Sequence, residues 1–147
     1  MEQPQYNLLD RQRFEVEYDP IFTQYGTGTT TWSPLASGAL TGKYLNGVPA
    51  GSRASLEGYE KLKKGMIDSD RGQERMKRVA SYIKIAEEHN LSPSKLAIAW
   101  CLLNKNVSTV ILGASSIGQL QDNLDSLDCI EALKDNNLVN SLNNIGR

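Results

Sequence analysis

The spacing of apolar residues predicts a long amphipathic helix just past the middle of the chain. Its inward stripe follows the i, i+3, i+4, i+7 rule and consists of Met76, Val79, Ala80, Ile83 and Ala86. Asn90 is a plausible stop for this helix because asparagine tolerates the left-handed conformation at a helix end.

A second helix is expected to begin directly afterwards. Ser92 and Pro93 form a cap followed by a first-turn proline, and the pattern continues through Asn104. Residues 96–103 are eight apolar residues in a row. This run predicts a helix that is buried on most sides rather than on one face.

Two more helices are predicted near the C-terminus. Ser116 and Gln119 match a capping box. We expect the inward face of the helix that follows to consist of Ile117, Leu120, Leu124 and Leu127. A weaker, asparagine-rich pattern indicates a last helix from about Glu131 to Ile145.

Three extended segments alternate with these helices. They are Glu2–Asn7, Thr29–Trp32 and Val107–Leu112, of which the last two are rich in β-branched residues. A short helix from Asp19 to about Gly26 separates the first two. The segment from Leu35 to about Asp70 is rich in glycine and is predicted to be irregular.

The alternation of strands and helices predicts an α/β fold with a parallel sheet. Three strands are few for a parallel sheet, whose strands need cover on both faces and neighbours at both edges. We therefore expect residues 1–147 to form part of a larger α/β unit, with open strand edges that favour association with other copies.

Composition narrows the possible functions. A hydrophobic content of 39% and a charged content of 22% argue against disorder, and 16 basic against 17 acidic residues leave no basic excess for nucleic acid. No apolar run is long enough for a transmembrane helix, and the polar start lacks a signal-peptide core. With Cys101 inside an apolar run, the two cysteines are typical of reduced thiols, which favours a cytoplasmic location.

General catalytic motifs fail. Gly26-Thr27-Gly28 lacks the third glycine of a dinucleotide fingerprint, and residues 38–44 are one residue too short for a phosphate loop. A single histidine, His89, and two distant cysteines cannot form a zinc cluster or a Cys-His dyad. We predict no metal site.

Possible anion contacts remain after two of the strands. Small residues follow the strand that ends at Trp32, with Lys43 and Arg53 further along the same irregular segment. Gly113-Ala114-Ser115 follows the next strand and leads into a helix N-terminus, where free N–H groups favour phosphate. Ligands of βα proteins gather at the C-terminal ends of parallel strands. The alternative is that these residues are ordinary loop glycines and surface charges.

These segments resemble the aldo-keto reductases, and within them most closely the branch that contains the β subunits of voltage-gated potassium channels. The similarity runs in order from residue 1 to about 127 and rests on the segments Gln3–Arg11, Thr31–Gly38, Leu40–Tyr44, Ser52–Leu56, Leu96–Leu102 and Val107–Ser115, with Gln119 and Asn123.

The resemblance implies a (β/α)8 TIM barrel that binds NADP(H) in an extended pose, of which this chain holds the last three βα units and a C-terminal helix. It places Gln3 near the nicotinamide and Lys43 at the phosphates. The pyrophosphate and ribose would be lined by Trp32, Ser33, Pro34, Leu35 and Ser37. Arg53 and Ser115 would bind the 2′-phosphate, and Gln119 and Asn123 would face the adenine. The matching segments also contribute further candidates for cofactor binding, namely Ala36, Tyr44, Ser52, Gly113 and Asp122. At the position of Asp122 the family commonly has glutamate.

The resemblance also implies what lies outside the chain. The family's catalytic Asp, Tyr, Lys and His or Asn belong to earlier strands, and no position here matches them, so we predict no catalytic residue in this chain. Three hypotheses follow. The chain is the NADPH-binding part of an enzyme that reduces aldehydes or ketones, a piece of a redox-sensing potassium channel β subunit, or a nonenzymatic half-barrel module.

Overall fold

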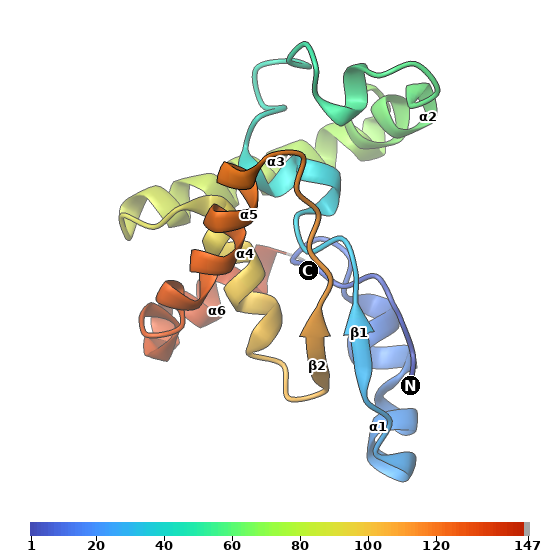
Figure 1. The fold of residues 1–147 in the computed structure, drawn as a ribbon, viewed down its shortest axis with the longest axis vertical. Helices are drawn as coiled ribbons and strands as arrows, with labels where there is room; N and C mark the ends of the chain where they lie inside the picture. Colours follow the sequence, from blue (N-terminus) through green and yellow to red (C-terminus); the bar gives the residue numbers. More distant parts are fainter. Residues whose placement is uncertain (146–147) are drawn as a thin grey trace.

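The computed structural model describes residues 1–145 as a helix-rich α/β unit with two parallel strands (Figure 1). In chain order the elements are η1 (Arg13–Glu17), α1 (Asp19–Tyr25), β1 (Thr29–Thr31), η2 (Ala36–Thr41), η3 (Arg53–Ser55), α2 (Glu60–Lys63), η4 (Lys64–Asp68), α3 (Asp70–Glu88), α4 (Pro93–Leu102), β2 (Val107–Val110), α5 (Ile117–Leu124), η5 (Asp125–Cys129), η6 (Ala132–Lys134) and α6 (Asn136–Ile145).

The sheet is parallel, as the alternating pattern predicts. β1 pairs with β2, and the register aligns Thr31 with Val110. The N-terminal segment lies on the other side of β1, where the Thr30 N–H donates to the Glu2 carbonyl over 3.0 Å and the Tyr6 N–H donates to the Trp32 carbonyl over 3.2 Å. The expected third extended segment is therefore present as parallel bridges rather than as a full strand. Both named strands end one or two residues earlier than predicted.

Helices α3 and α4 confirm the two central predictions. Ser69 caps α3 by accepting the Gly72 N–H over 3.0 Å. Val79 and Ala86 are buried as predicted, whereas Ala80 is exposed and the buried Tyr82 was not foreseen. α4 begins at Pro93, and residues 96–101 are all buried. It ends two residues earlier than expected because Leu103 and Asn104 turn toward β2.

The prediction that Ile117, Leu120, Leu124 and Leu127 point inward is wrong. Their exposed fractions are 88%, 46%, 53% and 63%. The opposite face of α5 packs on α4 instead, where the Asp122 carboxylate accepts the Ser94 hydroxyl over 2.9 Å and lies 3.6 Å from the Lys95 ammonium. Asn123, a polar residue, is the buried one. Polar contacts with α4 thus set the rotation of α5, and its apolar stripe faces outward.

The last helix also begins later than the sequence pattern suggests. Two short 3-10 turns, η5 and η6, occupy the space up to Lys134, and α6 starts at Asn136. Asp135 has an extended backbone and separates η6 from α6, and its carboxylate accepts the Asn137 N–H over 2.8 Å. An aspartate that caps the following turn starts a new helix rather than continuing an old one.

The core lies between the N-terminal segment, α3, α4 and α6. Tyr6 stacks on Phe14 with ring centroids 4.3 Å apart, and Trp100 lies against Tyr6 at 5.1 Å. α6 joins this cluster through Asn143, whose side chain accepts the Trp100 indole N–H over 3.1 Å and whose carbonyl accepts the Arg11 guanidinium over 2.6 Å. These contacts hold the loop after the N-terminal segment in place, and that loop borders the site described next.

Candidate functional site

The backbone after β1 adopts an unusual conformation. Ser33, Ala36 and Ser37 have φ angles of 59°, 48° and 58°, and Gly38 has 91°. Left-handed backbone at residues with a side chain costs about 1–3 kcal/mol each, and such strain clusters at ligand sites. Buried Asn7 supports the turn, because its amide donates to the Ser33 carbonyl over 2.9 Å. The segment 33–38 is thus held by the core, and the N–H groups of Ala36, Ser37 and Gly38 are hydrogen-bonded within it.

Lys43 lies across this segment. A Cβ at Gly38 would come within 2.6 Å of the Lys43 Cε and 2.8 Å of its Nζ, so glycine is what leaves room for the lysine. The ammonium lies 5.2 Å from the ring centre of Tyr44, which adds a cation–π contact. Tyr44 itself is buried, and its hydroxyl donates to the Ser37 carbonyl over 3.4 Å. Tyr44 therefore supports the segment from the core side.

A pocket of about 480 Å³ opens beside the segment 33–38. It is lined by Gln5, Asp10, Trp32, Ser33, Ala36, Ser37, Lys61, Leu62, Gly65, Met66, Ser69, Arg71 and Arg75. We call the residues that the family resemblance places around the dinucleotide the predicted cradle. Four of them line one pocket: Trp32, Ser33, Ala36 and Ser37. Pro34 and Leu35 lie between them on the inner side, where Pro34 is buried and Leu35 packs on the core.

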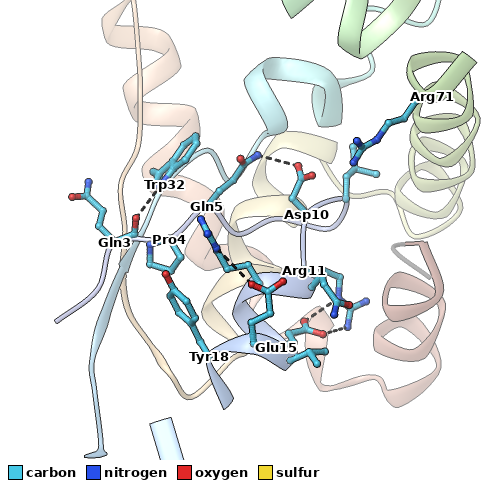
Figure 2. Close-up of a pocket in the computed structure, with 14 residues that line it drawn as sticks. Gln3, Pro4, Gln5, Asp10, Arg11, Glu15, Tyr18, Trp32 and Arg71 are labelled. Carbon is cyan, nitrogen blue, oxygen red and sulfur yellow. Dashed lines mark hydrogen bonds and ion pairs between the residues drawn. The ribbon is translucent and has the colours of Figure 1, made fainter. Parts of the chain in front are cut away.

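A second pocket of about 800 Å³ adjoins the first along the N-terminal segment (Figure 2). Gln3 lines it, and the Trp32 indole N–H donates to the Gln3 carbonyl over 3.2 Å. Trp32 is 44% exposed and borders both pockets. The predicted nicotinamide residue Gln3 and the predicted cradle therefore meet at Trp32.

The other predicted cradle residues form a hydrogen-bonded group at the start of α5. The Gln119 N–H donates to Ser116 Oγ over 3.2 Å, which confirms the predicted cap. The Gln119 side chain reaches back one residue further than in a standard capping box, since its Oε1 accepts the Ser115 N–H over 2.9 Å and the Ser115 hydroxyl over 3.0 Å. Asn123 fixes the loop by donating to the Gly113 carbonyl over 3.2 Å.

Three predicted residues lie outside both groups. The Asp122 carboxylate is occupied by Ser94 and Lys95 on α4. Arg53 is exposed on η3 and lines neither of the two pockets described. Ser52 is buried, and its hydroxyl is an orphan, without a hydrogen-bond partner among residues 1–145.

The structure adds an ion pair that the sequence did not reveal. Arg75 on α3 contacts the Asp10 carboxylate with two hydrogen bonds of 2.8 Å each, and Gln5 donates to the same carboxylate over 3.0 Å. Burial works to raise the pKa of Asp10, but the Arg75 guanidinium outweighs it and lowers that pKa. Arg71 lies one turn earlier on α3, and no local pattern in the sequence relates either arginine to Asp10, which lies 65 positions before Arg75.

The buried titratable groups are poor candidates for chemistry. Burial raises the pKa of the Cys101 thiol to about 12, which makes it an inert core residue. Burial also raises the pKa of Tyr6 well above its usual value. Within residues 1–145 no cluster of three metal-ligating side chains occurs, and none of the helices there has the length and apolar character needed to span a bilayer.

Sequence comparison identifies the class of protein. The aldo/keto reductase family matches residues 1–143, and the chain belongs to that family. The fold of residues 1–145, a parallel sheet covered by helices with its pockets beside a strand end, agrees with part of the barrel that this family implies.

Individual relatives are potassium channel β subunits by name. The chain is 46% identical over 134 residues to a probable voltage-gated potassium channel subunit beta of Oryza sativa subsp. japonica and 44% identical over 134 residues to one of Arabidopsis thaliana. A putative subunit of Schizosaccharomyces pombe is 45% identical over 132 residues. Each match covers 90% of this chain but only 38–40% of the relative, so the chain spans about two fifths of their length.

Proposed function

We propose that this chain is the NADP(H)-binding part of an aldo-keto reductase that reduces aldehydes or ketones by hydride transfer. The observation that carries the proposal is the left-handed segment 33–38 with Lys43 lying over Gly38. The Ser33 and Ser37 hydroxyls and an ammonium beside a strand end form a suitable environment for a pyrophosphate. The cofactor would supply the hydride.

The residues around this segment fit an extended dinucleotide. Gln3 would contact the nicotinamide, and the exposed indole of Trp32, which is hydrogen-bonded to Gln3, would line the adjoining ribose and pyrophosphate. Arg53 would bind the 2′-phosphate, because a guanidinium fork can contact a phosphate bidentately. The unpaired Ser52 hydroxyl beside it is a donor that such a ligand could satisfy.

The proposed active site extends beyond residues 1–147. We assign this chain to the last three βα units of the barrel, followed by its C-terminal helix. The acid that protonates the carbonyl oxygen would come from strands outside the chain. The carbonyl substrate would be bound by the complete barrel, in the cytoplasm, and the chain alone would be inactive.

The test is a titration of the purified chain with NADPH and NADH, followed by nicotinamide fluorescence. We expect saturable binding with a preference for NADPH. Arg53→Ala should reduce the ratio of NADPH to NADH affinity about tenfold, the effect of one charged hydrogen-bonding partner. Arg78→Ala, a change of the same residue type on α3 away from both pockets, is the control and should leave the ratio within twofold.

Two results would contradict this proposal. Absence of NADPH binding would mean that the isolated chain is not a cofactor-binding unit. An unchanged NADPH to NADH ratio in Arg53→Ala would show that another residue selects the 2′-phosphate.

The names of the relatives favour a second candidate function. The chain could be a piece of a potassium channel β subunit that senses redox state through a bound cofactor. The genomic sequence upstream of Met1 separates an enzyme from a third candidate, a nonenzymatic half-barrel module. An open reading frame that encodes the catalytic Asp, Tyr and Lys supports an enzyme, whereas stop codons before Met1 favour a nonenzymatic half-barrel module.

A further inference from the structure

The 480 Å³ pocket carries more positive charge than its own acidic residue can neutralise. Lys61, Arg71 and Arg75 line it, and Asp10 is the one carboxylate among the lining residues. Asp10 is already engaged by Arg75 through two hydrogen bonds of 2.8 Å. No ion pair joins Arg71 or Lys61 to a carboxylate within residues 1–145. Arg71 lies close enough to Asp10 to help lower the pKa of that carboxyl, but neither Arg71 nor Lys61 uses its hydrogen-bond donors in an ion pair there.

Arg71 is held at this place by the packing of α3. A Cβ at Gly72 would lie 2.7 Å from the Ile67 backbone nitrogen, so glycine lets the start of α3 approach η4 closely. The Ser69 cap fixes the same turn. Figure 2 shows Arg71 projecting from α3 toward the loop that carries Asp10, and Arg71 lines both pockets. Its guanidinium therefore lies near the point where the pockets meet.

The opposite wall of the pocket offers hydrogen-bond donors without charge. It contains Ser33, Ala36 and Ser37, the three residues whose left-handed backbone is strained. Strain of this kind persists where the surrounding structure enforces it, and it recurs at ligand sites. The pocket thus combines a wall of cations with a wall of small residues that permits close approach of a ligand.

We infer that this pocket binds an oxyanion, a carboxylate or a phosphate, between the cations Arg71 and Lys61 and the segment 33–37. Arg53 lines neither pocket, so this anion site differs from the proposed 2′-phosphate contact. The oxyanion would be carried by an acidic carbonyl substrate, since the proposed function already assigns the pyrophosphate of the dinucleotide to the segment 33–38 and Lys43. Only this choice of source rests on the proposed function.

Trp32 provides a direct readout in the full 147-residue chain. It lines the pocket and is 44% exposed, whereas Trp100 is buried in the core and gives a constant background. Succinate and inorganic phosphate are titrated at constant ionic strength, since screening alone changes the attraction between charges. NADPH is titrated separately through its own fluorescence.

The variant Arg71→Gln should weaken binding of the anions about tenfold, because one charged hydrogen-bonding partner is lost. The matched control is Arg78→Gln, two turns along the same helix and outside the pocket, which should change affinity less than twofold. Arg71→Lys keeps the charge and should retain most of the affinity for phosphate. Circular dichroism confirms that each variant is folded, which is expected because Arg71 is exposed.

The outcomes identify the source of the anion. If Arg71→Gln weakens succinate and phosphate but not NADPH, the site serves an acidic substrate. If it weakens NADPH as well, the pocket is only part of the pyrophosphate contact already proposed, and the separate anion site is overturned. If Arg71→Gln and Arg78→Gln behave alike with all three ligands, the inference is overturned. Anion binding by a chain that fails to bind NADPH would instead reject the proposed function and leave the anion site standing.

Discussion

Helices α4 and α5 lie side by side, and both carry enough apolar residues to belong to a core, yet their burial differs. Six consecutive residues of α4 are buried, and the helix is covered by the N-terminal segment, η5 and α5. α5 buries Asn123 and exposes its apolar stripe. The apolar pattern of a helix shows that a face needs cover, but it does not show whether the cover belongs to the same chain.

The difference has a physical consequence. The stripe of α5 is exposed among residues 1–145, and the chain spans only about two fifths of the length of its relatives. In the isolated chain it is an exposed apolar patch, and such patches promote association. α4, by contrast, should stabilise this chain whether or not the rest of the barrel is present.

The largest expected effect is therefore a contrast in unfolding free energy. Leu96→Ala in α4 removes a fully buried side chain and should lower the free energy of unfolding by about 2–5 kcal/mol. Leu124→Ala in α5 removes a side chain that is half exposed and should change it by less than about 0.5 kcal/mol. Urea titration at one temperature measures both. Equal losses would mean that α5 is buried in solution, through self-association or a different packing.

A smaller effect is expected on association. The wild-type chain should form concentration-dependent oligomers, and the double variant Leu120→Gln, Leu124→Gln should reduce them, because it removes half of the exposed stripe. Analytical ultracentrifugation measures the change. Tyr25→Gln, on the exposed α1, removes an apolar side chain elsewhere and serves as the control. A monodisperse wild-type monomer with a sharp melt would contradict this prediction.

The smallest effect concerns the polar contacts that Lys95 on α4 makes with α5 and with the start of η5. A hydrogen bond from Gln121 and the Lys95 ammonium, 3.2 Å from the carboxylate, lower the pKa of Asp125 below its ordinary 3.8. A carboxyl group with a lowered pKa stabilises the fold above that ordinary pKa, and the stabilisation is lost as the pH falls through the folded-state value. Asp125 should therefore stabilise the fold at pH 5 but not in strong acid.

Thermal unfolding at pH 5 and pH 2.5 tests this contribution. The Tm of the wild-type chain should fall slightly further between the two values than that of Lys95→Gln, which lacks the cation. Protonation of Asp10 and the other carboxylates lowers the Tm of both chains alike. The difference between the two falls in Tm therefore isolates the Lys95 contacts. An equal or larger fall in Lys95→Gln would show that these contacts do not stabilise α5.

Local signals predicted much of the fold. The Ser92-Pro93 cap and the apolar run that follows locate α4 to within two residues, and Ser116 with Gln119 locates the start of α5. These features depend on neighbours within one helical turn. The rotation of α5 depends on Ser94 and Lys95, which are about 30 residues away, and periodicity carries no information about such contacts.

The candidate site likewise has features that the local sequence predicts and features that depend on tertiary contacts. The segment 32–37 and the group at Gly113–Asn123 were predicted because each is continuous in the chain and resembles a known family. The left-handed conformation of Ser33, Ala36 and Ser37 was not predicted, because residues other than glycine adopt it only when tertiary contacts enforce it. The Asp10–Arg75 pair joins residues 65 positions apart, so it appears only in the fold.

The contact between Gly38 and Lys43 makes the two positions interdependent in any survey of substitutions. Every other residue type at position 38 would displace the Lys43 chain by a Cβ lying 2.6 Å from Cε, in addition to straining a φ of 91°. Because the clash is with the flexible end of the lysine, a change at Gly38 would shift the ammonium, and the left-handed φ would be the larger cost. Both single substitutions and the double are therefore needed, because they separate the backbone strain at position 38 from the displacement of the Lys43 ammonium.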